Sequence, residues 1–132
     1  MGSTDSDRRE FTRLRSALAV RYKFISSSER DPLMERICEG TTANISVGGL
    51  LLLGPLPKME WLKDLLVGRM SIGINLTLSL GDKPIKALTR IIWVEAMEEG
   101  EVGLRMGLRI VEMPPDHRRM LSDFLIRETS VP

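Results

Sequence analysis

Cysteine and histidine are almost absent from this sequence. Cys38 is the only cysteine and His117 the only histidine among the 132 residues. One thiol excludes an internal disulfide and cannot supply the ligands of a structural zinc site, so we expect a reducing compartment and no bound metal. No serine or cysteine nucleophile is recognisably paired with His117, which we interpret as an ordinary solvated or capping residue.

The chain also lacks any strong excess of charge and has few aromatic side chains. Its 19 Lys+Arg and 18 Asp+Glu give a formal net charge of +1. This balance disfavours a non-specific nucleic-acid binder, and an aromatic content of 5% leaves few platforms on which bases could stack. Any site for an anion must therefore be local.

Long apolar runs are missing too. No stretch approaches the length needed to span a bilayer, and residues 1–10 are polar and charged, without the apolar core of a signal peptide. We therefore expect a cytoplasmic chain without membrane insertion. Its length fits one domain, and a hydrophobic content of 42% is sufficient for a core.

Signs of catalysis are equally scarce. Carboxylates cluster only in the segment 95–101, a charged loop of the kind that is usually solvated. Neither a metal-ligand spacing nor a phosphate-binding loop is present. We therefore expect a protein that is not an enzyme.

The sequence predicts six short strands, three of them from alternation of apolar and polar residues and three from composition or a preceding turn. The clearest is 70–80, where Ile72, Ile74 and Leu76 share one face with further leucines and the opposite face is polar. The other expected strands cover 18–24, 36–45, 50–53, 85–94 and 102–110. Six short strands separated by turns suggest a small barrel or sandwich.

Two segments depart from this alternation and predict helices. Pro114 and Pro115, followed by Asp116, are typical of a helix start, and we expect a C-terminal helix over 114–128. An apolar stripe should face the barrel, formed by Met120, Leu121, Phe124 and Leu125. A short amphipathic helix is expected within 57–67. Residues 1–7 are small and acidic, and we expect them to be disordered.

Arginines gather near the N-terminus, at positions 8, 9, 13 and 15. A planar guanidinium suits bidentate capture of a phosphate or of a guanine edge. Taken alone, the cluster is more commonly a solvated charged arm.

A second group of candidate residues lies at 44–49. Asn44 and Ser46 can donate and accept hydrogen bonds from a turn, while Gly48 and Gly49 allow close approach of a ligand or a positive φ. Taken alone, an Asx-type turn between two strands is the ordinary interpretation.

Together and in this order, the two groups resemble the PilZ domain family. Arg9 and Arg13 match its RxxxR element, and the segment 44–49 matches its D/N-x-S-x-x-G element. The resemblance continues through 48–52, 90–94 and 102–110 and covers roughly 8–127. It implies a mainly β domain over 8–132, a six-stranded antiparallel Greek-key-like β-barrel with a C-terminal helix, that binds cyclic di-GMP.

The resemblance also implies roles for individual residues. Arg9 and Arg13, in a ligand-binding arm over 8–15, would grip phosphate and guanine. The other half of the site would be formed by Asn44, Ser46, Gly48 and Gly49. Arg8, directly before the RxxxR element, implies two cyclic di-GMP molecules per chain. No cofactor is implied.

Two functional hypotheses remain open. In the first, cyclic di-GMP folds the arm onto the barrel and changes the surface shown to an unidentified downstream protein. In the second, the chain is a nucleotide-independent interaction domain with the PilZ fold, and the arginines only solubilise the N-terminus. The segment 57–67 looks longer and more helical than the usual connection, and Trp61 within it either caps the barrel or belongs to a docking surface.

Overall fold

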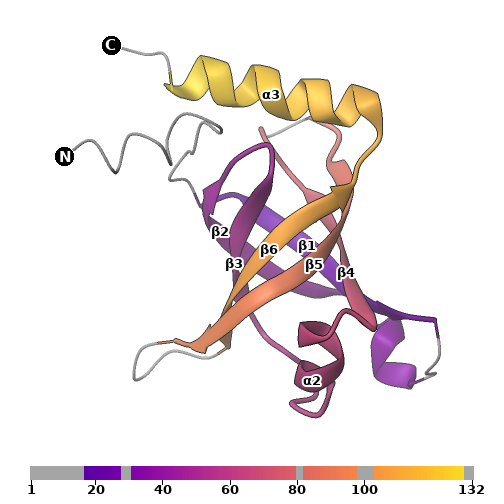
Figure 1. Ribbon diagram of the computed structural model, residues 1–132. Helices are drawn as coiled ribbons and strands as arrows, with labels where there is room; N and C mark the ends of the chain where they lie inside the picture. Colours follow the sequence, from indigo (N-terminus) through magenta and orange to yellow (C-terminus); the bar gives the residue numbers. More distant parts are fainter. Residues whose placement is uncertain (1–16, 28–30, 80–81, 98–102, 130–132) are drawn as a thin grey trace.

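Six strands form the body of the molecule in the computed structural model, which describes residues 17–27, 31–79, 82–97 and 103–129. The strands are β1 (Ala19–Ser26), β2 (Cys38–Ile45), β3 (Gly49–Gly54), β4 (Met70–Leu76), β5 (Ile85–Ala96) and β6 (Leu104–Glu112). The helices are the 3-10 helix η1 (Pro32–Glu35), α2 (Trp61–Leu66) and α3 (Pro115–Thr129). Figure 1 shows the strands wrapped around one axis.

Every strand pairs with two neighbours, and all pairs are antiparallel. The order β1-β2-β3-β6-β5-β4 closes on itself. The expected six-stranded antiparallel barrel is therefore confirmed. Closure places β1 opposite β6 and β4 opposite β3.

Helix α3 covers one end of the barrel (Figure 1). Leu121, Phe124 and Leu125 are buried as expected, but Met120 is 37% exposed, so its place in the predicted stripe was wrong. Neighbouring residues on a helix point about 100° apart, which turns Met120 away from the barrel when Leu121 faces it.

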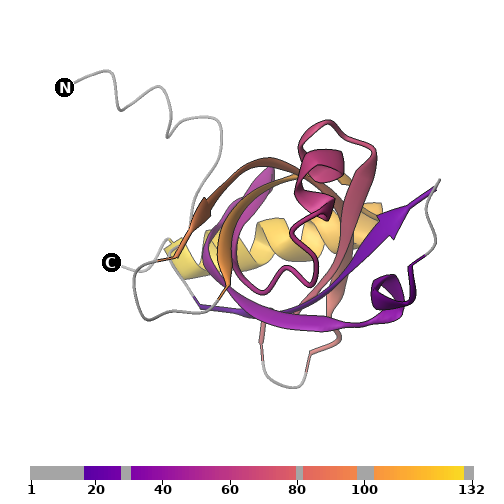
Figure 2. The same cartoon turned by 90° about the horizontal axis from the view of Figure 1, so that it is seen from below.

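Helix α2 lies at the opposite end, as the view from below shows with α3 behind the barrel (Figure 2). Trp61 is 2% exposed, and its ring centroid lies 5.2 Å from that of Phe24. Tyr22 contacts Phe24 edge-on, at 5.8 Å between centroids. Of the two interpretations of Trp61, the structure therefore supports the cap on the barrel.

Two local features differ from expectation. Helix η1 was not predicted; Asp31 caps it by accepting a hydrogen bond from the Leu33 amide at 3.0 Å. Strand β4 ends at Leu76 rather than at residue 80, although Leu78 remains buried. The predicted disordered segment 1–7 and the arm 8–15 lie outside the described residues.

His117 ties α3 to the barrel. Its Nδ1 accepts a hydrogen bond from the backbone amide of Lys86 at 2.9 Å. Strand β6 ends its pairing with β5 where Leu88 faces Glu112, so the imidazole supplies an acceptor beyond the end of that ladder. The side chain therefore joins two elements instead of capping a helix. Of the helices in the described ranges, none has the length and apolar character to cross a membrane.

Candidate ligand site

The turn between β2 and β3 is ordered from within by Ser46. This residue is 1% exposed, and its amide donates to the Gly49 carbonyl at 2.8 Å. Its Oγ accepts from the Gly48 amide at 3.2 Å and donates to the Gly49 carbonyl at 3.4 Å. The hydroxyl predicted to contact a ligand is thus engaged in holding the turn in shape.

Asn44 faces the other way because of an irregularity in β2. Thr42 pairs with Leu52, but the next pair joins Asn44 to Leu51, so Ala43 is an extra residue. Such a bulge reverses the alternation of side chains. Thr42 is buried and Asn44 lies on the outer face, where the predicted contact with a ligand requires it.

The two glycines of the turn serve the barrel. A Cβ at Gly49 would collide with the carbonyl oxygen of Leu108 in β6. The Gly48 carbonyl accepts a hydrogen bond from the Ile110 amide at 2.9 Å. Neither glycine is among the described residues with positive φ, so that suggested reason for them was wrong. Close approach of the β6 backbone accounts for Gly49.

The arm that carries the arginines joins the barrel beside this turn. Leu18 donates to Thr42 Oγ1 at 3.0 Å and accepts from the Thr42 amide at 3.0 Å, two residues before Asn44. Arg13 lies five positions before Leu18, a reach of at most about 18 Å at 3.3–3.6 Å per residue. Arg8, Arg9 and Arg13 themselves fall outside the described residues. The attachment point nevertheless lies within reach of both predicted motifs.

Trp93 and Arg109 are two further candidates that were not singled out from the sequence. Arg109 is exposed and pairs with Gly49 across β3 and β6. Trp93 is 41% exposed, and its indole lies over Gly107, where any Cβ would collide with the ring. The only signal for Trp93 in the sequence was Gly107, a glycine inside an otherwise regular strand. The bulge in β5 between Ile91 and Trp93 sets the position of the ring.

Positive charge accumulates on this outer face. Arg90 of β5 is directly opposite Arg109 of β6, and its guanidinium lies against Gly68. Neither arginine forms an ion pair with a carboxylate within residues 17–27, 31–79, 82–97 and 103–129.

No metal centre is evident in the part of the chain that the structure describes. Within it, no three His, Cys, Asp or Glu side chains gather as the ligands of an ion would. Close to the turn lie the exposed guanidinium of Arg109 and the exposed indole of Trp93, and the turn itself is held by internal hydrogen bonds. Such a set suits an anionic, aromatic ligand.

Comparisons with known proteins agree with this geometry. The family model described as PilZ domain matches residues 7–127. No curated protein matches the sequence significantly.

Three solved structures share the fold. The inhibitor of motility MotI/DgrA of Bacillus subtilis is 17% identical with a TM-score of 0.63, and the match covers 92% of this chain but only 50% of that one. This chain therefore spans about half the length of that relative. The PilZ domain with c-di-GMP of YcgR from Escherichia coli is 12% identical, with a TM-score of 0.56 and 91% and 90% covered. The PilZ domain of CeSA from a cellulose synthesizing bacterium is 17% identical, with a TM-score of 0.51 and 88% and 92% covered.

Proposed function

This chain belongs to the PilZ domain family, and from that premise we propose that it is a receptor for cyclic di-GMP that signals to a partner protein. One observation carries the proposal. Leu18, where the arginine-bearing arm meets the barrel, is hydrogen-bonded to Thr42, two residues from the outward Asn44. The structure of the similar PilZ domain of YcgR is one with c-di-GMP, which supports the same ligand class here.

Each motif has a distinct task in this proposal. Arg9 and Arg13 anchor the ligand through charge-assisted hydrogen bonds to phosphate and guanine. Asn44 contacts a guanine edge from the barrel. Ser46 acts through the turn that it holds, and Gly49 allows β6 to lie close enough for Arg109 to reach the ligand.

The outer face of β5 and β6 extends the site. Trp93 offers an exposed ring on which a guanine can stack, and stacking on an aromatic side chain is worth about 1–3 kcal/mol per base. Arg90 and Arg109 supply positive charge for the phosphates. The ligand would thereby be held between the arm and this face, which places an altered surface before a partner.

Signalling rather than catalysis fits this chemistry. The described residues present donors and a stacking surface but no paired nucleophile and base. We therefore propose an adaptor without enzymatic activity, acting in the cytoplasm. The second candidate, a nucleotide-independent interaction domain, retains the ordered turn but gives no role to the opposed pair Arg90 and Arg109.

Titration calorimetry of the full chain with cyclic di-GMP tests the proposal. We expect saturable binding that is not reproduced by GMP and that is strongly reduced in Arg13→Ala. Arg21→Ala is the matched control, because Arg21 lies in β1, whose neighbours are β2 and β4, on the far side of the barrel from β6. Absence of any binding heat, together with failure of cyclic di-GMP to raise the melting temperature, would establish the nucleotide-independent alternative.

A further inference from the structure

Thr42 is a buried polar residue beside the point where the arginine-bearing arm joins the barrel. It lies in β2, is 1% exposed, and pairs with Leu52 of β3. Its Oγ1 accepts a hydrogen bond from the Leu18 amide at 3.0 Å, and its own amide donates to the Leu18 carbonyl at 3.0 Å. Both backbone groups of Leu18 are therefore bonded to one residue.

The Thr42 hydroxyl takes the place of a backbone acceptor. The register of β1 and β2 pairs Ala19 with Thr41, so its continuation places Leu18 opposite Thr42. In a regular antiparallel ladder, such a pair exchanges two backbone hydrogen bonds, one in each direction. Here the Thr42 amide makes one of these bonds, but the Leu18 amide donates to the hydroxyl. A side chain thereby extends the ladder by one residue, next to the bulge at Ala43.

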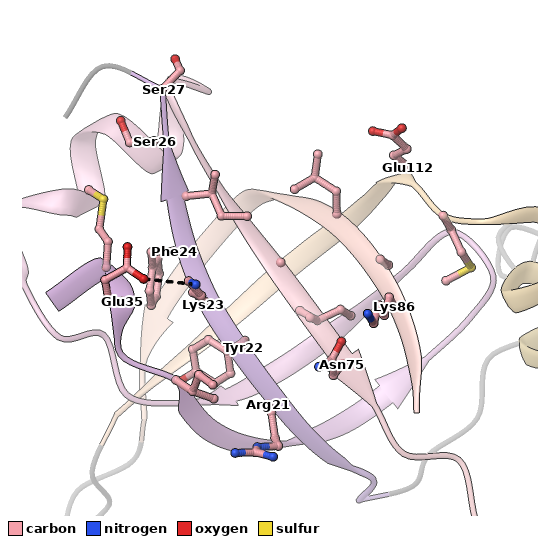
Figure 3. A pocket seen from close by; sticks show the side chains of 18 of the residues that line it. Arg21, Tyr22, Lys23, Phe24, Ser26, Ser27, Glu35, Asn75, Lys86 and Glu112 are labelled. Atoms are coloured by element: carbon pink, nitrogen blue, oxygen red, sulfur yellow. Dashed lines mark ion pairs between the residues drawn. The ribbon is translucent and has the colours of Figure 1, made fainter. Parts of the chain in front are cut away.

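Strand β1 gives Leu18 a fixed base. Tyr22 and Phe24 point into the core and are each 1% exposed. Arg21 and Lys23 of the same strand line a groove of about 1380 Å³ over β1 and β4 (Figure 3). The strand pairs with β2 on one side and with β4 on the other. The direction in which the preceding chain leaves the barrel is therefore set at Leu18.

Thr42 also belongs to the strand that carries Asn44. Only Ala43 separates the two residues, and the bulge there turns Asn44 to the outer face. One residue thus links the end of the arm to the segment that presents Asn44. Without the bond to the hydroxyl, Leu18 would be held to β2 by a single backbone hydrogen bond.

We infer that the Thr42 hydroxyl is a positioning group for nucleotide binding, which holds Leu18 against β2 and so fixes the arm relative to Asn44. This inference rests on the proposed function. Thr42 is buried and does not itself touch the ligand. If the hydroxyl is removed, the ligand must order Leu18 itself, and ordering one backbone residue weakens binding roughly tenfold.

Thr42→Val is the direct test, because it removes the hydroxyl and keeps a β-branched side chain that suits a strand. We expect calorimetry to show cyclic di-GMP binding about tenfold weaker than in the wild type. Exchange of the Leu18 amide, followed by NMR in the nucleotide-free protein, should become faster. Thr42→Ser keeps the hydroxyl and should restore both the affinity and the protection of Leu18.

Thr89 provides the matched control. It is also buried, at 0% exposed, and its Oγ1 donates to the Ile72 carbonyl at 2.8 Å. Thr89→Val therefore removes a hydroxyl-to-backbone bond of the same kind, between β5 and β4. We expect the melting temperature to fall by a similar amount in Thr42→Val and Thr89→Val. Affinity and exchange at Leu18 should change only in Thr42→Val.

A double-mutant cycle distinguishes an effect on the arm from an effect on Asn44. Losses caused by independent groups add, whereas losses that pass through one shared group do not. We expect the losses of affinity in Thr42→Val and Asn44→Ala to add in the double variant.

Four results would overturn the inference in a wild type that binds cyclic di-GMP. They are equal affinity in Thr42→Val, a Thr42→Ser variant as weak as Thr42→Val, an equal loss in Thr89→Val, and no further loss from Thr42→Val in the Asn44→Ala background. A wild type that binds no cyclic di-GMP would refute the proposed function and, with it, the role of Thr42 in binding. Exchange at Leu18 would in that case still report whether the hydroxyl anchors this residue.

Discussion

Asn44, near the end of β2, and Ser46, in the turn that follows, lie two positions apart, yet the barrel uses them differently. Ser46 is buried, and its hydroxyl bonds to two neighbouring backbone groups. Asn44 lies on the outer face because the bulge at Ala43 reverses the alternation. A single sequence motif therefore contains one buried residue that orders the turn and one residue on the outer face of the barrel.

The arginines of the arm should dominate the binding energy. Hydrogen bonds to charged groups are worth about 1.5–3 kcal/mol each, so Arg9→Ala and Arg13→Ala should each severely weaken cyclic di-GMP binding. Ser46→Ala should cost only about 0.5–1.5 kcal/mol, the net value of a neutral hydrogen bond. Calorimetry on the three variants measures the order. Unchanged affinity in both arginine variants would remove these residues from the site.

Tyr22 predicts a specific response of stability to alkaline pH. It is the only tyrosine, it is 1% exposed, and its hydroxyl donates to the Pro55 carbonyl at 2.6 Å. Burial, with a smaller contribution from the Cys38 thiolate, raises the pKa of Tyr22 far above its usual value. The folded state thus keeps its proton where the unfolded chain, with a pKa of about 10, loses it.

The Tyr22 hydroxyl should therefore leave the free energy of unfolding unchanged below pH ~10 and lower it as the pH rises above that value. Tyrosinate absorbance should rise only together with unfolding, since no other tyrosine contributes. Tyr22→Phe should reduce this alkaline loss and lower stability at neutral pH by about 0.5–1.5 kcal/mol. A reversible tyrosinate signal from the folded protein near pH 10 would contradict the burial argument.

At the level of elements, the two tryptophans separate stability from binding. Trp61 begins α2 and is buried against Phe24, while Trp93 is exposed over Gly107. Trp61→Ala should destabilise the fold by about 3–5 kcal/mol. Trp93→Ala should change stability much less and weaken cyclic di-GMP binding by about 1–3 kcal/mol. Denaturant unfolding and calorimetry test both, and equal loss of stability in the two variants would count against this division.

Composition or a turn predicted three of the six strands, and the other three were predicted from alternation of apolar residues, which reports which face is buried. It does not report pairing. In β4 the alternation continues to Leu78, yet the ladder with β5 ends where Leu76 faces Ile85. Helix η1 depends on a single Asp31 cap and a proline, and four residues are too few for a periodic signal. The two bulges beside the site, in β2 and β5, could not be predicted from the sequence either, because they arise from the register between paired strands.

At the level of the whole molecule, closure of the barrel determines what becomes a site. The motif residues were recognised in the sequence through their family pattern. Trp93 and Arg109 were not, because only pairing of β6 with both β3 and β5 brings them beside the turn.

Strand β5 runs between the proposed nucleotide site and α3. Its C-terminal half carries Trp93 beside that site, and its N-terminal half carries Lys86. The Lys86 amide also bonds to His117, which fixes the start of α3. Strand β5 therefore links the proposed nucleotide site to α3.

The number of ligands per chain depends on Arg8. In PilZ domains an arginine directly before the RxxxR element accompanies a pair of cyclic di-GMP molecules, and this chain has that residue. An extra guanidinium can stack on an exposed guanine and offset the phosphate charge of a second ligand. We expect calorimetry to give two cyclic di-GMP per wild-type chain and one per Arg8→Leu chain. The barrel keeps Arg109 and Trp93 in both proteins, so the first ligand should still bind to the variant. A ratio of one in the wild type, unchanged by the substitution, would mean that Arg8 has no part in a second site.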